Sequence, residues 1–190
     1  MRFAAAAVVI LGVALTGFAQ EEQESSPVEL EVLRSYVGVW DAQIEVWSQG
    51  LDAAPVTFEG VETNRPYGEH WIASDFDSEF MGQTMKIHSI VGYDLDEKKL
   101  VGMIVDHGPY SASMSGEYDA ESKTVKWTTL AKAPNGNPMV QNTTVTQKSP
   151  NERVLVLMVP SGGEGEFSKF MQITFTKRPE SPSESSEETP

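Results

Sequence analysis

Three histidines, His70, His88 and His107, have the widest chemical repertoire in this chain. Imidazole binds metal ions and transfers protons near neutral pH, and Asp75 and Asp106 are among the acidic residues nearby. Histidines and carboxylates from adjacent strands can together bind zinc or another divalent cation. No two of these histidines have the spacing of a metal-binding motif, so we interpret them as surface or turn residues and predict no metal and no cofactor. A metal-assisted enzyme that uses His70, Asp106 or His107 stays an open alternative.

A second group of reactive residues consists of the carboxylates Asp75, Asp77 and Glu79, which share one face of a predicted strand. Paired carboxylates can transfer protons or bind calcium. Here they alternate with apolar residues such as Phe76 and Phe80, which is the ordinary pattern of a half-exposed strand. The chain also has no cysteine and no Gly-x-Ser-x-Gly motif. The sequence therefore predicts an outward, solvated position for the three acids and no catalytic residue.

The elements that position these residues begin with a short helix. Ser26 and Glu29 form a capping-box pattern around a proline, and Leu30 and Leu33 follow at helical spacing. The helix is expected to stop at Gly38, after which the apolar period changes from 3.6 to 2.

Ten segments with strand character follow the helix, and turn-forming residues such as those of Arg65–Gly68 separate them. In chain order they are Trp40–Val46, Pro55–Thr63, Glu69–Phe80, Thr84–Tyr93, Lys99–His107, Ser111–Tyr118, Thr124–Ala131, Met139–Lys148, Arg153–Val159 and Phe167–Lys177. Short strands separated by turns predict an all-β fold, and closure into a barrel leaves no exposed strand edge. We therefore predict an antiparallel meander barrel of eight to ten strands behind a short N-terminal helix.

Two turns repeat one pattern 25 residues apart, in Tyr93–Leu100 and Tyr118–Val125. The aspartate after each tyrosine can accept hydrogen bonds from its own turn, and the lysine five residues beyond the tyrosine can pair across it. Because this spacing fits two strands and two turns, we expect both turns at the same end of the barrel.

A short helix followed by Gly38-x-Trp40 resembles the opening of the lipocalins and other calycins. In those proteins the tryptophan closes one end of the barrel beneath a basic residue of the last strand. Lys177 or Arg178 is the matching residue here, and strand parity favours Lys177.

Four further motifs resemble the bacterial family called domain of unknown function 1579. They are the turns Gly92–Asp94 and Gly116–Asp119, the pair Val105–Asp106 and the closing segment Ile173–Arg178. The resemblance covers about residues 30–178 and consists mostly of turns and barrel-closing residues. It implies an exported calycin-like barrel and no particular activity.

Candidate binding residues come from the apolar residues assigned to the inner face of the barrel. The predicted ligand-binding residues are Ile44, Phe58, Met85, Ile87, Met103, Met114 and Trp127, with Val46, Met171 and Ile173 beside them. Methionine and aromatic side chains line adaptable cavities well, but a barrel of about eight strands is nearly filled by its own side chains. A filled core and a ligand cavity therefore both stay open.

The N-terminal residues predict export. Residues 1–19 read as a signal peptide, because Arg2 precedes the apolar stretch Phe3–Leu15 and small residues precede the expected cleavage site. That stretch is shorter than the roughly 20 residues of a membrane span, so no membrane attachment is expected after cleavage. Residues 20–25 form an acidic linker, residues 26–179 one domain, and residues 180–190 a disordered acidic tail. The expected location is periplasmic or secreted.

Charge limits the partners. Nine of the 28 acidic residues lie in 21–31 or 180–188, so the ends carry most of the net charge of −14. A mildly acidic domain without a basic patch argues against nucleic acid as a partner.

We predict a non-catalytic barrel that binds a small apolar or amphipathic molecule. An interaction module that uses an outer face near Trp47 is a further alternative, and the oligomeric state stays open.

Overall fold

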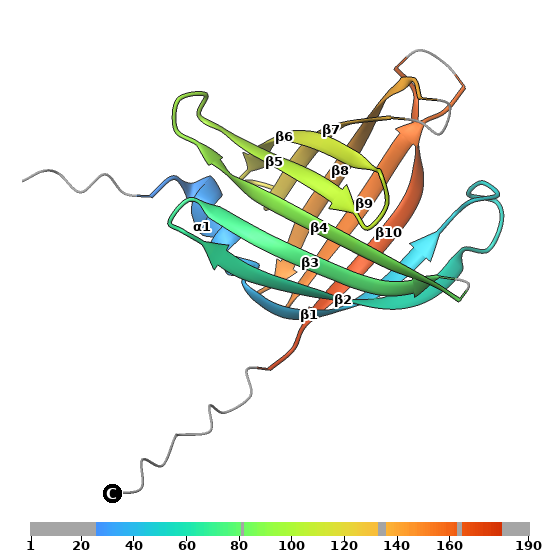
Figure 1. Ribbon diagram of the computed structural model, residues 1–190, viewed down its shortest axis with the longest axis horizontal. Helices are drawn as coiled ribbons and strands as arrows, with labels where there is room; N and C mark the ends of the chain where they lie inside the picture. Colours follow the sequence, from blue (N-terminus) through green and yellow to red (C-terminus); the bar gives the residue numbers. More distant parts are fainter. Residues whose placement is uncertain (1–25, 81, 133–135, 163–164, 180–190) are drawn as a thin grey trace, which may run out of the picture.

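The computed structural model describes residues 26–80, 82–132, 136–162 and 165–179, which form one helix, α1 (Val28–Ser35), and a closed antiparallel barrel (Figure 1). Each strand pairs with the next along the chain, and β1 closes the ring by pairing with β10. The ten strands of these residues are β1 (Gly38–Val46), β2 (Val56–Tyr67), β3 (Trp71–Phe80), β4 (Gln83–Asp94), β5 (Lys99–Asp106), β6 (Ser111–Asp119), β7 (Thr124–Lys132), β8 (Pro138–Ser149), β9 (Glu152–Pro160) and β10 (Phe167–Lys177).

This architecture confirms the predicted all-β meander barrel with a short N-terminal helix, at the upper end of the predicted strand number. The largest boundary error concerns Arg65–Gly68, which was predicted as a turn. Residues 65–67 continue β2 and pair with β3, so the turn falls at Gly68–His70 instead. A proline is tolerated there because Pro66 needs no ladder bond from its nitrogen at the end of the strand.

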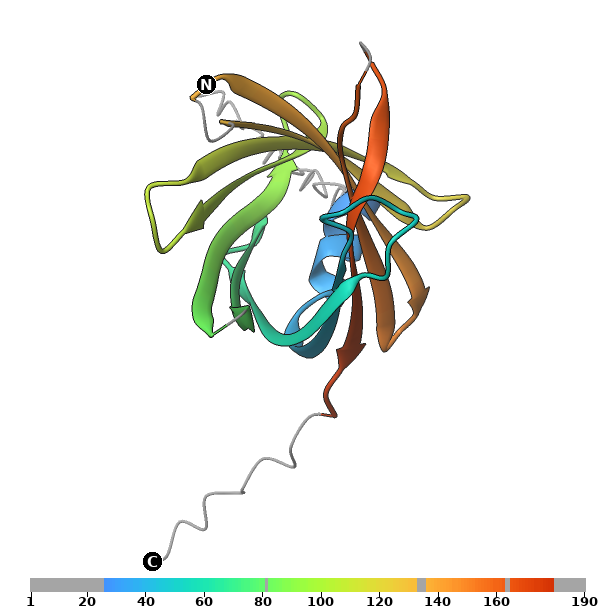
Figure 2. The same ribbon diagram turned by 90° about the vertical axis from the view of Figure 1, so that its right-hand side faces the viewer.

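The helix closes one end of the barrel. Figure 2 looks along the barrel from the opposite end and shows α1 through the ring of strands. Leu30 and Leu33 of this helix are fully buried. Arg34 fixes the helix to the β2–β3 turn, since its Nη2 donates a hydrogen bond of 2.8 Å to the carbonyl oxygen of Glu69. The helix therefore covers this end of the barrel.

The predicted capping box does not form. Pro27 is the N-cap residue, and its carbonyl oxygen accepts hydrogen bonds from the amides of Leu30 and Glu31 at 3.0 and 3.3 Å. The Ser26 hydroxyl oxygen accepts a hydrogen bond from Arg34 Nη1 at 3.2 Å instead. The proline fixes the backbone at the start of the helix, so a serine cap is not needed there.

Two glycines make room for tryptophans on neighbouring strands. Gly116 lies opposite Trp127, and a Cβ atom at this glycine would come within 2.6 Å of the indole ring. Gly92 lies opposite Trp71, where the same distance would be 2.5 Å. Each indole ring therefore lies over the backbone of the glycine on the neighbouring strand. Because Gly116 of β6 has no side chain, Trp127 has room to reach the barrel interior.

The two repeated turns adopt one geometry, as predicted. Asp94 Oδ1 and Asp119 Oδ1 each accept hydrogen bonds from the amides two and three residues later, at 2.9–3.2 Å. Because the turns join β4 to β5 and β6 to β7 in a meander, they lie at the same end of the barrel. The two lysines predicted to pair across them, Lys98 and Lys123, adopt left-handed conformations, and Asp119 pairs with Lys126.

The predicted signal peptide (1–19), acidic linker (20–25) and acidic tail (180–190) lie outside the described residues. Within the described part of the chain, no helix combines the length and the apolar character that crossing a bilayer requires.

Candidate functional site

A cavity of about 350 Å³ occupies the interior of the barrel. Its walls are predominantly apolar and come from α1 and from strands β2 to β10, with Ile72, Val91 and Leu157 as typical members. Polar side chains such as Gln141 and Thr143 interrupt this wall. Ligand cavities of about this size usually combine apolar walls with a few polar groups that orient the ligand. The interior therefore has the composition of a small-molecule binding site.

Some of the predicted binding residues line this cavity. Ile87, Met114 and Trp127 contribute to its wall, as do the two residues placed beside them on the last strand, Met171 and Ile173. They reach the cavity because they lie on the inward parity of their strands. Whether they bind a ligand stays a prediction.

Three other predicted residues point inward without lining the cavity. Ile44 is fully buried and forms an apolar cluster with residues of β3 and β10, against which Phe58 and Met85 pack. The ring centroids of Phe58 and Phe80 lie 4.7 Å apart. These residues fill their part of the barrel and stabilise it beside the cavity.

The predicted inward position of Met103 is wrong. Its side chain is 53% exposed on the outer face of β5. The inward parity of this strand belongs to the buried Leu100 and to Ile104, which lines the cavity. Alternation from Leu100 therefore places Met103 outside, and Met103 is no longer a candidate binding residue.

Arg153 of β9 lies at the closed end of the cavity and was not predicted. Its guanidinium carbon lies 4.3–4.5 Å from the ring centroids of Trp40, Tyr36 and Phe175, and only 3% of the residue is exposed. Guanidinium stacks well on aromatic faces because it is planar and weakly hydrated. Arg153 thus holds the position that the resemblance assigned to a basic residue of the last strand.

Of the two residues proposed for that role, Lys177 is close and Arg178 is not. Lys177 Nζ lies 5.4 Å from the centroid of the Trp40 ring. Arg178 instead donates hydrogen bonds to Asp41 on the outer surface, at 2.6 and 2.9 Å. Arg153 was missed because the basic residue beneath Trp40 was sought on the last strand. A charged residue two positions before Leu155, on the same parity, is the signal that identifies it.

A chain of polar contacts surrounds the Arg153 guanidinium. Its Nη2 forms a hydrogen bond and ion pair with Glu62 Oε2, which also accepts a hydrogen bond of 3.0 Å from Asn64 Nδ2. The side-chain oxygen of Asn64, Oδ1, in turn accepts a hydrogen bond from the Ser74 hydroxyl. The Glu62 carboxylate therefore balances the buried positive charge of Arg153. The Glu62 side chain itself is 18% exposed.

Tyr36 covers the other side of Arg153. Its main-chain oxygen accepts a hydrogen bond of 2.7 Å from Trp40 Nε1, which links the helix end to β1. Burial raises the pKa of the Tyr36 phenol to about 12. Burial lowers the pKa of Arg153 to about 10, so the guanidinium still carries its charge at neutral pH.

The raised pKa of Tyr36 predicts a loss of stability in alkaline solution. Below pH 10 the phenol is protonated in both states, whereas between pH 10 and 12 it ionises only in the unfolded chain. The unfolded state then binds fewer protons, so the free energy of unfolding falls, by roughly 2–3 kcal/mol at pH 12. Urea titrations from pH 9 to 11.5 measure this decline, and Tyr36→Phe should reduce it. An equal decline in both proteins would contradict the assignment.

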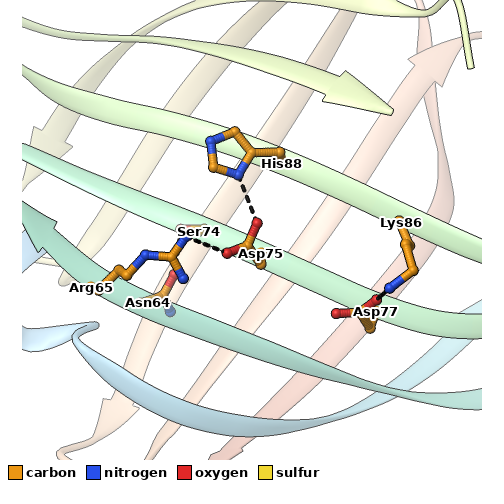
Figure 3. Close-up of polar contacts among 7 residues, drawn as sticks. All are labelled: Asn64, Arg65, Ser74, Asp75, Asp77, Lys86 and His88. Carbon is orange, nitrogen blue, oxygen red and sulfur yellow. Dashed lines mark hydrogen bonds and ion pairs between the residues drawn. The ribbon is translucent and has the colours of Figure 1, made fainter. Parts of the chain in front are cut away.

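A second polar cluster lies on the outer face of β2, β3 and β4 (Figure 3). His88 Nδ1 lies 2.7 Å from Asp75 Oδ1, and Arg65 Nη2 lies 2.6 Å from Asp75 Oδ2. The hydrogen bond from His88 is the main cause that lowers the pKa of Asp75. Lys86 pairs with Asp77 beside them. His88 and the acids thus face outward, as predicted, and their exposure makes this a solvated network.

The three histidines do not converge. His70 lies in the β2–β3 turn near α1, whereas His88 and His107 line a shallow outer groove. His107 Nδ1 accepts a weak hydrogen bond of 3.4 Å from the amide of Lys86. Across the described residues, no group of three or more His, Asp or Glu side chains is arranged to hold a metal ion.

Solved structures with the same fold share little sequence with this chain. Rv2717c from M. tuberculosis aligns with a TM-score of 0.60 at 9% identity, over 79% of this chain and 97% of that chain. The S-type phycobiliprotein lyase CPES from Guillardia theta aligns with a TM-score of 0.52 at 11% identity, over 82% and 94% of the two chains. At such identities the likeness shows the calycin-like barrel fold alone. No curated protein matches the chain.

A family profile matches residues 27–177, from the helix N-cap to the end of β10. The matched region therefore contains the whole described barrel, including Trp40 and the Glu62–Arg153 pair. The chain belongs to the family described as protein of unknown function DUF1579.

Proposed function

We propose that this protein is a non-catalytic carrier that binds one small, predominantly apolar molecule inside its barrel. The observation that supports the proposal is the cavity of about 350 Å³ with mostly apolar walls. A barrel filled by its own side chains has no such space, so the cavity favours binding over the filled-core alternative.

Apolar burial supplies most of the favourable free energy of binding. It contributes about 25 cal/mol per Å², so a ligand that buries about 300 Å² of apolar surface gains roughly 7–8 kcal/mol before the cost of its lost freedom. A micromolar complex needs a net gain of about 8 kcal/mol after that cost, so apolar burial of this extent alone gives weaker binding. Polar groups on the cavity wall then orient the ligand and increase its affinity modestly.

The two alternative functions find less support. The histidines and carboxylates of the metal-assisted enzyme do not converge among the described residues. Trp47, expected at an exposed interaction surface, is half-buried, and Lys169 Nζ lies 3.9 Å from its ring centroid. We also propose that the carrier acts outside the cytoplasm, because the predicted signal peptide over 1–19 favours export.

Titration with the uncharged dye N-phenyl-1-naphthylamine tests the proposal. We expect saturable fluorescence enhancement with one dye per chain. The variant Ser89→Phe places a ring in the cavity, which Ser89 lines, and should weaken dye binding at least tenfold. The matched control Ser113→Phe puts the same ring on the exposed outer face of β6 and should leave binding unchanged. Unfolding curves check that both variants remain folded.

Two results would contradict the proposal. One is the absence of saturable binding for the dye and for every apolar competitor. The other is equal weakening by the two phenylalanine variants, which would place the dye on the outer surface.

A further inference from the structure

Two buried hydrogen-bond donors at the closed end of the cavity are left without a partner among the described residues. They are the Tyr36 hydroxyl and Arg153 Nη1. Both residues belong to the cavity wall, and the Arg153 guanidinium carbon lies 4.4 Å from the centroid of the Tyr36 ring. Buried polar atoms are nearly always paired in folded proteins, because an unmade hydrogen bond is costly. Two unpaired donors in adjacent residues of a cavity wall are therefore a signal for a ligand atom.

The chemistry of the two groups determines what that atom must be. A guanidinium nitrogen only donates hydrogen bonds, and a tyrosine hydroxyl can donate one as well. Glu62 already engages the other terminal nitrogen, Nη2, of Arg153. The free position at Nη1 therefore requires a hydrogen-bond acceptor, and the Tyr36 hydroxyl, which can donate or accept, can donate to the same acceptor.

The charge balance of the site decides between a charged and an uncharged acceptor. Glu62 neutralises Arg153 within the buried pair. A ligand carboxylate would bring a second negative charge beside Glu62, and an uncompensated charge in a low-dielectric interior is strongly unfavourable. An uncharged oxygen, such as that of a ketone, ester or amide, meets the need for an acceptor without this cost.

We propose that the ligand of this cavity carries an uncharged carbonyl oxygen at its leading end, which accepts hydrogen bonds from the Tyr36 hydroxyl and Arg153 Nη1. The inference rests on the proposed carrier function and adds the class and the orientation of the ligand. Both donor atoms are buried in the structure without a ligand, so the proposal requires the polar ends of Tyr36 and Arg153 to turn toward the cavity. The apolar remainder of the ligand extends toward the open end of the barrel, past Met114 and Ile104.

The cavity volume sets the size of suitable probes. A water occupies about 30 Å³ of liquid, so a cavity of about 350 Å³ has room for about a dozen waters. Covalently bonded atoms pack more closely than waters, so ligands with a dozen or somewhat more non-hydrogen atoms fit. Three probes of that size differ mainly in their polar end. They are 5-phenyl-2-pentanone, with a ketone, 4-phenylbutanoate, with a carboxylate, and pentylbenzene, with no polar group.

Displacement of N-phenyl-1-naphthylamine at neutral pH measures the three affinities. We expect the ketone to bind about three- to tenfold more tightly than pentylbenzene, since a neutral hydrogen bond contributes about 0.5–1.5 kcal/mol. We expect 4-phenylbutanoate to bind more weakly than the ketone.

The variant Tyr36→Phe removes one donor and nothing else. It should weaken ketone binding, with the Arg153 Nη1 donor still in place, and leave pentylbenzene binding unchanged. Because this hydroxyl has no protein partner among the described residues, the melting temperature of the variant should not fall. The matched control Tyr93→Phe removes a hydroxyl from the same apolar cluster, from a residue that does not line the cavity, and should change neither affinity.

The outcomes separate the inference from the function on which it rests. Equal binding of ketone and pentylbenzene, or tighter binding of the carboxylate, overturns the carbonyl inference and leaves the carrier function standing. Ketone binding that Tyr36→Phe does not weaken overturns it as well. Failure of the ketone to displace a dye that binds overturns the inference alone, whereas failure of the dye itself to bind contradicts the carrier function and the inference together.

Discussion

Replacement of Trp40 by alanine should lower the free energy of unfolding by about 3–5 kcal/mol, the range for a large buried aromatic side chain. Trp40 has no exposed surface, and its ring stacks against the guanidinium of Arg153 at 4.3 Å. Its Nε1 also donates a hydrogen bond to the main-chain oxygen of Tyr36. The substitution therefore removes apolar packing, a cation–π contact and the link between the helix end and β1 together.

Urea denaturation measures the effect of Trp40→Ala, and Trp47→Ala is the matched control on the same segment. Trp47 is half-buried beside Lys169, outside the two apolar clusters of the barrel, so its loss should cost much less. Similar costs for the two variants, or an unchanged melting temperature for Trp40→Ala, would show that Trp40 does not hold the closed end of the barrel.

The position of Trp40 was predictable because a strand has a strict period of two. Once Trp40 is placed inside, Ala42, Ile44 and Val46 follow on the same face, and all are buried. The same rule, counted from Leu100, places Met103 outside. The prediction failed there because it gave more weight to the apolar character of methionine than to the alternation of the strand.

The cavity was harder to predict than the barrel. Strand patterns identify which residues point inward, and Ile87, Met114 and Trp127 do line the space. Whether inward residues fill the interior depends on side-chain volumes summed across strands that are distant in sequence. Polar inward residues such as Thr129 and Thr143 break the apolar pattern, and they are the local signal that the interior is incompletely packed.

Arg153 illustrates a second limit of sequence reasoning. A buried charge needs a partner, and its partner Glu62 lies 91 residues away on β2, a strand that does not neighbour β9 in the barrel. Only closure of the barrel brings the two side chains together. Its parity with Leu155 indicates that Arg153 points inward, but nothing near it in the sequence identifies Glu62 as its partner.

Replacement of Arg153 by methionine should cost about 3–5 kcal/mol, because it leaves the largely buried Glu62 carboxylate without its counter-ion. Methionine retains much of the apolar length of the side chain, so most of the loss reports the unpaired charge. The same Arg→Met change at Arg178 is the matched control. Its partner Asp41 is exposed, so that substitution should cost much less than Arg153→Met.

The cause of the loss in Arg153→Met can be isolated by a second change and by pH. Adding Glu62→Gln removes the uncompensated charge, so the double variant should be more stable than Arg153→Met alone. Unpaired burial raises the pKa of a carboxyl group, so acidification that protonates Glu62 should narrow the gap between Arg153→Met and the unchanged protein. A double variant as unstable as the single one would mean that Arg153 stabilises the fold through its aromatic stack. In that case the balance of charge that favours an uncharged ligand would lose its support.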